Sequence, residues 1–241
     1  MAAGLSIDRA NEGVLTVQIC RPPDNAFSMG MCHELSEVLA HPPDGAHVVV
    51  LQGSEGVFCR GREGVTDIKA AAATVGALSQ VAQSLRDTSL VTIAKVNGDA
   101  AGFGVGLAAL CDVALASARS QFWFPEISHG LAPSLVLSWL PRVVGRRQAF
   151  WLSATGAVLG AAEAKQLGLV NDVTTSDDLD AVTSSMVETL LSKSPRVHAD
   201  IKRDLRDFEE ASIGTVSLMA RDRLLLSTLT GLDEGTQVAS R

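Results

Sequence analysis

Apolar residues along the first two thirds of the chain follow the periods of buried strands. In Gly13–Cys20 every second residue is apolar, as in a strand with one buried face. His47–Gly53 and Val91–Val96 are almost continuously apolar and rich in β-branched side chains, which is typical of strands buried on both faces. We therefore expect strands at Gly13–Cys20, His47–Gly53, Val57–Arg62, Val91–Val96, Asp112–Ser117, Gln121–Phe124 and Leu169–Val173.

Helical spacing of apolar residues predicts helices between and after these strands. Ser28 is a typical N-cap for a helix that Pro42 and Pro43 end. The alanine-rich Ala70–Leu85 carries an apolar stripe made of Val75, Leu78, Val81 and Leu85. Further helices are expected at Val105–Leu110, Leu135–Leu140, Gly145–Leu152, Ala161–Leu167 and Leu179–Leu191, with Pro141 separating the second from the third.

The strand Val91–Val96 runs into a glycine-rich turn in which Gly102 and Gly104 flank Phe103. Glycine lets the backbone approach a ligand closely. The first amides of the following helix lack an internal acceptor, so those of Phe103 and Gly104 are placed to hold an anionic oxygen. A turn that only packs tightly explains the same residues. Because Val57–Arg62 also ends at a glycine, two such turns are predicted to face each other.

A single carboxylate, Glu126, follows the apolar segment QFWFP. Apolar surroundings raise the pKa of a carboxyl group, as an acid–base catalyst near neutral pH requires. His129 before Gly130 is expected to be a surface or lining residue.

Composition excludes several classes of function. A formal charge of −7 without a lysine/arginine run argues against nucleic acid as a partner. The four cysteines have no metal-type spacing, so we expect reduced packing residues in a cytoplasmic protein and no metal. No apolar run has the length of a signal peptide core or a membrane span.

In its motifs the chain resembles the crotonase superfamily, the enoyl-CoA hydratase/isomerase fold, from about Leu15 to about Leu191. The order and spacing of the motifs carry the resemblance. They are RPPDNAF (Arg21–Phe27), VVVLQG, VFCRGR, VNGDAAGFGVGLAALCDVALA, FPEISHGLAP, LPRVVGRRQA and ATGAVLGAAEAKQLGLVNDV.

The resemblance implies an α/β fold, a crotonase-like spiral of repeated β-β-α units. Residues 1–194 would form this core. Residues 195–241 would form a C-terminal helical region that packs on its own or a neighbouring subunit and offers Lys202, Arg203 and Arg206 to a nucleotide. The apolar segment at Leu135–Leu152 would join subunits, so a homotrimer or homohexamer is expected.

By resemblance, the backbone amides of Arg62 and Phe103 form an oxyanion hole for a coenzyme A thioester, which is the substrate and not a permanently bound cofactor. The turns at Gly61 and Gly102 present them. The Asn25-Ala26-Phe27 turn would line the pantetheine arm, mostly through backbone atoms. Arg60, Arg62 and Lys69 are candidates to attract phosphates, although solvated loop charges are the alternative.

The family carries carboxylates at three places, which fall on Gly106, Glu126 and Ser134. Hydratases of this family have glutamates at the first two places. A lone glutamate at the second place is the pattern of Δ3,Δ2-enoyl-CoA isomerases. Glu63 is a candidate second carboxylate because it neighbours an oxyanion donor, with a solvated loop glutamate as the alternative. A glutamate restored at Gly106 is expected to add hydratase activity if the helix accommodates it.

Three functions follow from this comparison. The first is an acyl-CoA enzyme that forms and protonates a thioester enolate, most simply a Δ3,Δ2-enoyl-CoA isomerase. The second is an enoyl-CoA hydratase or dehydratase, possibly acting on a carrier-protein-bound acyl thioester in polyketide biosynthesis. The third is a non-catalytic acyl-CoA-binding member of the family.

Overall fold

A computed structural model describes residues 4–11, 13–65, 67–211, 215–216 and 218–223. The contacts divide the chain into two units, Met1–His198 and Ala199–Arg241, which we describe separately. The predicted boundary at residue 194 and the packing of the tail stay predictions. The sequence also predicts that the C-terminal helical region is interrupted near Gly214, a position that lies outside the described residues.

Unit 1 is built on a six-stranded sheet of order β1-β2-β3-β5-β7-β10. The first pair of strands is antiparallel and the other neighbours are parallel. The strands are β1 Gly4–Asn11, β2 Val14–Cys20, β3 Val48–Gly53, β5 Val91–Val96, β7 Val113–Ser117 and β10 Asp172–Thr174.

A second sheet holds the strands that follow β3, β5 and β7 in the chain. Its order is β4-β6-β8-β9, with β4 Val57–Cys59, β6 Asp99–Ala101, β8 Gln121–Trp123 and β9 Leu159–Gly160. Each repeat therefore sends one strand to each sheet before a helix returns the chain. This alternation confirms the predicted spiral of β-β-α units.

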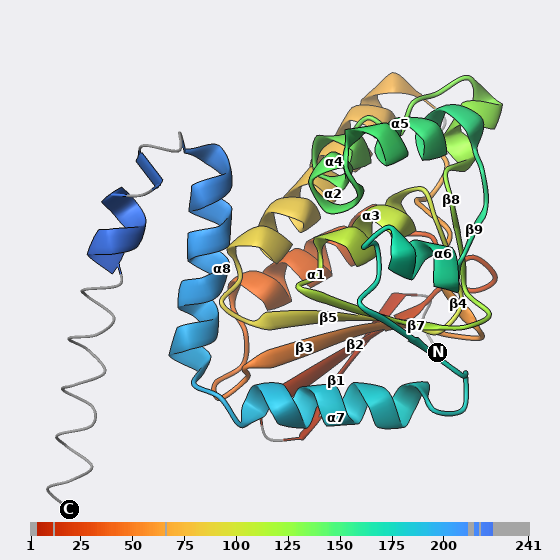
Figure 1. Cartoon of the computed structure of the whole chain (residues 1–241). Coiled ribbons are helices and arrows are strands. Elements are labelled where there is room, and N and C mark those ends of the chain that lie inside the picture. The colour runs from red at the N-terminus through yellow and green to blue at the C-terminus, as the bar shows by residue number, and fades with distance from the viewer. Residues whose placement is uncertain (1–3, 12, 66, 212–214, 217, 224–241) are drawn as a thin grey trace, which may run out of the picture. The chain divides into compact units, whose positions relative to one another are not determined.

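Helices cover both faces of the large sheet (Figure 1). The first three, α1, α2 and α3, lie on one face, and α7 lies on the other, where Leu179 packs with Val50 and Ile93. The helices of unit 1 are α1 Met29–Ala40, α2 Ile68–Asp87, α3 Phe103–Leu110, α4 Leu140–Val144, α5 Arg146–Thr155, α6 Ala161–Gln166 and α7 Leu179–Leu191, with short 3-10 turns η1 Pro125–His129 and η2 Val136–Ser138. Ser28 caps α1 as predicted, and its hydroxyl accepts a hydrogen bond from the Met31 amide at 3.3 Å.

Several predicted details were wrong. Val75 is 47% exposed, because the buried face of α2 continues through Thr74 and Ala77 instead. The helix predicted at Leu135–Leu140 is only the 3-10 turn Val136–Ser138. Pro141 lies between the two predicted segments, but it belongs to a helix of its own, α4, and its missing amide hydrogen costs no hydrogen bond at the second position of that helix. The strand predicted at 169–173 begins only at Asp172.

Three strands, β1, β6 and β9, were not predicted. In β1, Leu5 and Ile7 alternate with polar residues, and both side chains pack against the main core. The strands β6 and β9 have three and two residues, too few for a periodic pattern to show.

The cysteines are free thiols, as expected. Burial raises the pKa of Cys32 and of Cys59 to about 12, so both thiols stay protonated and unreactive near neutral pH. The described residues include no group of three or more side chains suited to hold a metal ion. None of the helices among them is both long and apolar enough to cross a membrane.

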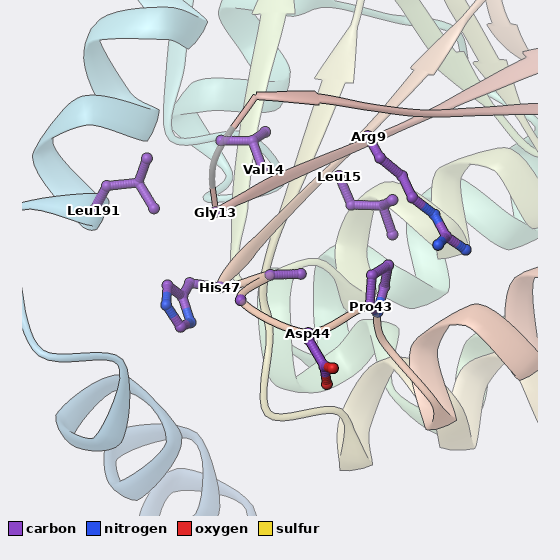
Figure 2. Close-up of a pocket in the computed structure, with 10 residues that line it drawn as sticks. Arg9, Gly13, Val14, Leu15, Pro43, Asp44, His47 and Leu191 are labelled. Atoms are coloured by element: carbon purple, nitrogen blue, oxygen red, sulfur yellow. The ribbon is translucent and has the colours of Figure 1, made fainter.

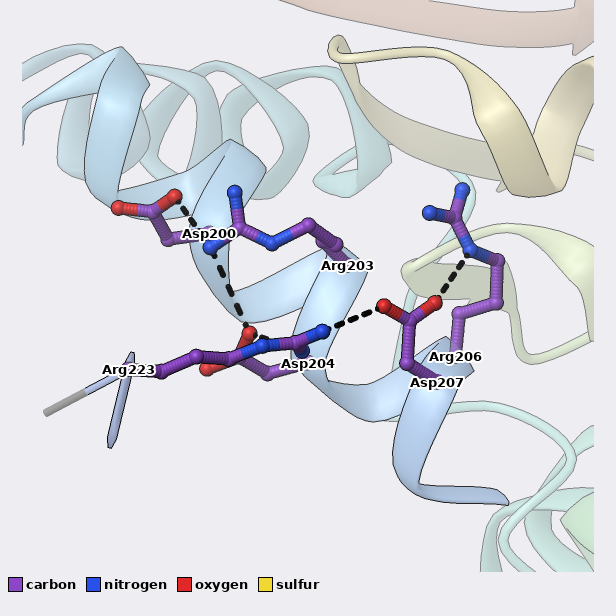
Figure 3. Close-up of polar contacts among 6 residues, drawn as sticks. All are labelled: Asp200, Arg203, Asp204, Arg206, Asp207 and Arg223. Carbon is purple, nitrogen blue, oxygen red and sulfur yellow. Dashed lines mark hydrogen bonds and ion pairs between the residues drawn. The ribbon is translucent and has the colours of Figure 1, made fainter. Parts of the chain in front are cut away.

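In the C-terminal region, α8 spans Pro195–Glu210 and carries a network of ion pairs (Figure 3). Arg223 donates to Asp204 at 2.6 Å and to Asp207 at 2.7 Å. Arg203 pairs with Asp200 at 2.8 Å, and Arg206 pairs with Asp207 at 3.1 Å. Two candidates for a nucleotide contact, Arg203 and Arg206, thus already have carboxylate partners. That contact stays a prediction.

Candidate active site

The carboxylate of Glu126 lies against the glycine turn that starts α3. A β-carbon at position 102 would lie 2.6 Å from Glu126 Oε1, so only glycine leaves room for the acid. Gly102 also has φ +53°, a conformation that other residues rarely adopt. Its amide donates to the Trp123 carbonyl at 3.0 Å, which joins the turn to the strand that leads to Glu126. The turn that starts α3 and the segment that carries Glu126 are thereby fixed to each other.

Glu126 has the environment that the sequence predicts. Its Oε2 is buried and has no hydrogen-bond partner among the described residues. Burial raises the pKa of Glu126 above its ordinary value, and a backbone hydrogen bond and the charges of Arg62 and His129 oppose this rise in part. A carboxylate with one oxygen buried and without a hydrogen-bond partner, as Oε2 is here, is suited to accept a proton from a bound molecule.

The turn at Gly61–Glu63, which follows β4, directs the amide of Arg62 away from Phe27. Phe27 bonds to both flanking residues: its amide donates to the Gly61 carbonyl at 2.9 Å, and its carbonyl accepts from the Glu63 amide at 2.8 Å. In a parallel bridge the residue between these two points its own amide to the other side. Consistently, the Arg62 amide has no backbone acceptor among the described residues.

The two glycine turns lie against each other, as the sequence predicted. Cys59 at the end of β4 lies so close to α3 that a β-carbon on Gly104 would lie 1.9 Å from its carbonyl oxygen. The rings of Phe27 and Phe103 meet edge to face with centroids 5.7 Å apart. A β-carbon on Gly61 would lie 3.7 Å from the carbonyl oxygen of Ala101. Phe103 is the first residue of α3, so its amide has no acceptor within the helix.

Side chains fill the place where a second acid would stand on α3. A β-carbon on Gly106 would lie 2.6 Å from Val136 Cγ2 and 3.0 Å from Trp139 Cζ2. The indole of Trp139 also donates to the Gly106 carbonyl at 3.1 Å. Helix α3 therefore does not accommodate the glutamate considered at position 106, because even an alanine there would have to displace Val136. Nothing in the sequence around Gly106 indicates this contact with a segment 30 residues away.

Glu63, the candidate second carboxylate, pairs with Arg21. The distance from Arg21 Nη2 to Glu63 Oε1 is 2.5 Å, and the glutamate side chain is 48% exposed. Arg21 Nη1 also donates to the Ala26 carbonyl at 3.0 Å. The pair thus ties the loop after Arg62 to the turn before Phe27. Of the two glutamates, only Glu126 has a buried oxygen without a hydrogen-bond partner among the described residues.

The residues expected along the coenzyme arm present little side-chain surface. Asn25 is 1% exposed and Phe27 is 0% exposed, so only main-chain atoms and Ala26 remain for a ligand at this turn. Among the basic candidates, Arg60 pairs with Asp99 at 2.6 Å. Lys69 is exposed on α2 and stays a candidate.

A separate cavity of about 600 Å³ lies at the starts of β2 and β3 (Figure 2). Its lining residues are Arg9, Gly13, Val14, Leu15, Pro43, Asp44, Gly45, Ala46, His47 and Leu191. None of the residues of the candidate site lines it. The glycine turns follow the ends of β4 and β6, whereas this cavity borders the beginnings of strands in the large sheet.

The sequence profile described as enoyl-CoA hydratase/isomerase matches residues 9–237. The chain belongs to this family. A probable enoyl-CoA hydratase of Mycobacterium leprae is 35% identical over 170 residues, which cover 64% of this chain and 58% of the relative. A probable enoyl-CoA hydratase of Rhodobacter capsulatus is 32% identical over 167 residues, which cover 66% and 65%. The chain thus spans less than two thirds of either relative.

Solved structures of the enoyl-CoA hydratase/isomerase family superpose over nearly the whole chain. A putative enoyl-CoA hydratase from Thermobifida fusca in complex with CoA has a TM-score of 0.86 at 28% identity, over 97% of this chain and 95% of that protein. The family membership and the fold expected from the motifs are therefore both confirmed.

Proposed function

We propose that the protein is a Δ3,Δ2-enoyl-CoA isomerase, which moves a proton from C2 to C4 of an acyl-CoA thioester by way of an enolate. One observation carries this proposal. Glu126 has a buried, unpaired oxygen beside two amide-bearing turns, while Val136 and Trp139 fill the position of a second acid at Gly106. A site with one base suits a reaction that takes a proton from one carbon and returns it to another.

The proposed steps use only this base and the two amides. Glu126 Oε2 takes a proton from C2 of a 3-enoyl thioester, and the C2–H electrons form a dienolate with its charge on the thioester oxygen. The amides of Arg62 and Phe103 donate hydrogen bonds to that oxygen. Glu126 then returns the proton to C4, which leaves the double bond between C2 and C3. A pair of such donors commonly lowers the barrier by several kcal/mol.

Coenzyme A is the proposed carrier of the acyl group. The CoA complex of the Thermobifida fusca protein supports this choice. In this chain the backbone of Asn25, Ala26 and Phe27 would line the pantetheine arm, and the turns at Gly61 and Gly102 would hold the thioester. The proposed reaction consumes no cofactor and needs no metal.

Hydration or dehydration is the second candidate function, and the names of the two relatives favour it. It requires a group that activates water besides Glu126. Glu63 is the candidate for this role, but its carboxylate is 2.5 Å from Arg21 Nη2. Protein-bound pantetheine is a possible carrier for this reaction as well.

A turnover screen with 3-enoyl-CoA and 2-enoyl-CoA thioesters separates these functions. We expect 3-enoyl-CoA to become 2-enoyl-CoA without a change of mass, and a deuterium label at C2 of the substrate to appear at C4 of the product, because the same carboxyl group takes and returns the proton. A product heavier by one water, formed faster than the isomer, would establish a hydratase instead. Saturable binding of both thioesters without turnover would identify a binding protein.

The proposal includes assembly into a trimer or a pair of trimers. Phe150 and Trp151 on α5 are 71% and 43% exposed. Phe150 lines a pocket together with Ile127, which follows Glu126 in the chain and is 41% exposed. Large exposed apolar side chains of this kind mark interaction surfaces. Phe150→Asp should shift the protein to monomers in light scattering, whereas Phe150→Leu should keep the assembly. A wild-type protein that is monomeric at micromolar concentration would rule the assembly out.

A further inference from the structure

Asn25 occupies a demanding position in the turn between β2 and α1. Its side chain is 1% exposed, and its backbone has φ +50°, in the left-handed region that few residues other than glycine and asparagine adopt. The family resemblance implies that the Asn25-Ala26-Phe27 turn lines the coenzyme arm mostly through backbone atoms, which leaves the Asn25 side chain without an assigned role. A side chain enclosed by protein has no surface to offer to a ligand, so another role must explain it.

The side-chain amide of Asn25 makes four hydrogen bonds within the protein. Its Oδ1 accepts from the Arg21 amide at 2.9 Å and from Ser54 Oγ at 3.1 Å. Its Nδ2 donates to the carbonyls of Ser54 at 3.0 Å and Val57 at 2.7 Å. The bonds fill its capacity and tie the turn before α1 to the hairpin between β3 and β4.

Phe27, two residues after Asn25 in the same turn, holds the loop that carries the Arg62 amide. Phe27 bonds to the Gly61 carbonyl and to the Glu63 amide, so its position sets the orientation of the peptide between them. That peptide carries the Arg62 amide. Arg21, whose own amide donates to Asn25, also pairs with Glu63 and so braces the far side of the loop.

We propose that the Asn25 side chain positions the Arg62 amide, acting through the Phe27 bridge, and does not itself contact the coenzyme. This inference rests on the proposed function, because it assigns the Arg62 amide to the thioester oxygen. A shift of about 1 Å in a group that stabilises a transition state costs on the order of 100-fold in rate. Loosening the turn should therefore slow the chemical step and leave coenzyme binding unchanged.

Asn25→Gly is the informative variant, because glycine tolerates the positive φ and removes the side chain together with its four hydrogen bonds. Asp24→Asn is the matched control: Asp24 lies in the same turn, but among the described residues its side chain pairs only with Arg60, at 3.4 Å on the surface. Ser54→Ala removes one of the four hydrogen bonds and provides a milder second variant.

For Asn25→Gly, kcat with 3-enoyl-CoA should fall by about 10-fold to 100-fold, while KM and the Kd of coenzyme A change by less than about twofold. Ser54→Ala should give a smaller loss in kcat of the same type, and Asp24→Asn should match the wild type. The pH at which kcat/KM falls should stay unchanged, since Glu126 is not affected. A rise in KM or Kd at constant kcat in Asn25→Gly would overturn the inference and restore the coenzyme contact.

Hydrogen exchange gives a readout that does not depend on activity. The Glu63 amide is bonded to the Phe27 carbonyl, so its exchange should accelerate in Asn25→Gly and not in Asp24→Asn. Unchanged exchange at Glu63 in folded Asn25→Gly, or in Ser54→Ala if the glycine variant does not fold, would refute the positioning role. A wild-type protein without isomerase activity would instead refute the proposed function and leave this measurement to decide on Asn25.

Discussion

The two turns of the candidate site present an amide each, but they are built by different means. The turn at Gly102–Gly104 is held by close packing: carbon at position 104 would overlap a backbone oxygen, and carbon at position 102 would overlap the acid. The turn at Gly61–Glu63 is held by hydrogen bonds to Phe27 and by the Arg21–Glu63 ion pair. The first turn is therefore intolerant of added atoms, and the second is sensitive to the loss of polar partners far away in the sequence.

This difference decides which substitutions each turn accepts. A steric turn fails when a side chain is added, whatever its chemistry. A turn held by hydrogen bonds accepts changes of its outward side chain, because the bonds use the backbone. Arg62 illustrates the second case, since its side chain is exposed while the backbone on both sides of it is fixed by Phe27.

Gly104→Ala should have the largest effect of the substitutions in either turn. The new β-carbon would lie 1.9 Å from the Cys59 carbonyl oxygen, a contact between backbones that no rotamer change relieves. We expect a destabilisation of about 3 kcal/mol or more. Chemical denaturation measures it, and Gly76→Ala on the exposed face of α2, where a β-carbon meets nothing within 4 Å, is the control. Equal stability of Gly104→Ala and the wild type would show that the two turns are not packed together.

In the second turn, backbone and side-chain changes should separate. Gly61→Pro should abolish activity, because Gly61 has φ +106° and proline requires a φ near −65°. Arg62→Ala should retain most of the activity, since the proposed donor is the backbone amide. Steady-state kinetics on both variants provides the test. Comparable losses in the two would mean that the guanidinium itself takes part in binding or catalysis.

The smallest expected effect is a change of stability with pH in Glu126→Gln. Because burial raises the pKa of Glu126 in the folded protein, the folded state binds this proton more readily than the unfolded state. The wild type therefore loses stability as the pH rises from below 4.5 through the raised value. Glu126→Gln should melt at a higher temperature than the wild type at neutral pH. The difference in Tm should shrink below pH 4.5, and a difference that grows on acidification would contradict the raised pKa.

The sequence predicts those parts of the site that depend on local signals, and it does not predict those that depend on contacts between distant segments. The steric turn was predicted because glycines and an apolar helix are local signals, and Glu126 was predicted because its apolar neighbours precede it directly. The role of Asn25 and the filling of the Gly106 position by Val136 and Trp139 were not. Both depend on contacts between segments distant in the sequence, and neither asparagine in a turn nor valine in an apolar segment distinguishes those contacts from ordinary packing.

The central claim is that Glu126 alone carries the proton. Its most direct test is the turnover of 3-enoyl-CoA by Glu126→Gln, compared with Glu63→Gln under the same conditions. Glutamine keeps the shape of the side chain and removes the base, so Glu126→Gln should lose on the order of 100-fold to 10,000-fold in kcat. Glu63→Gln should stay within about tenfold of the wild type, since its carboxylate braces a loop and an exposed ion pair contributes little. Wild-type turnover by Glu126→Gln together with an inactive Glu63→Gln would contradict the claim and place the base in the turn at Gly61–Glu63.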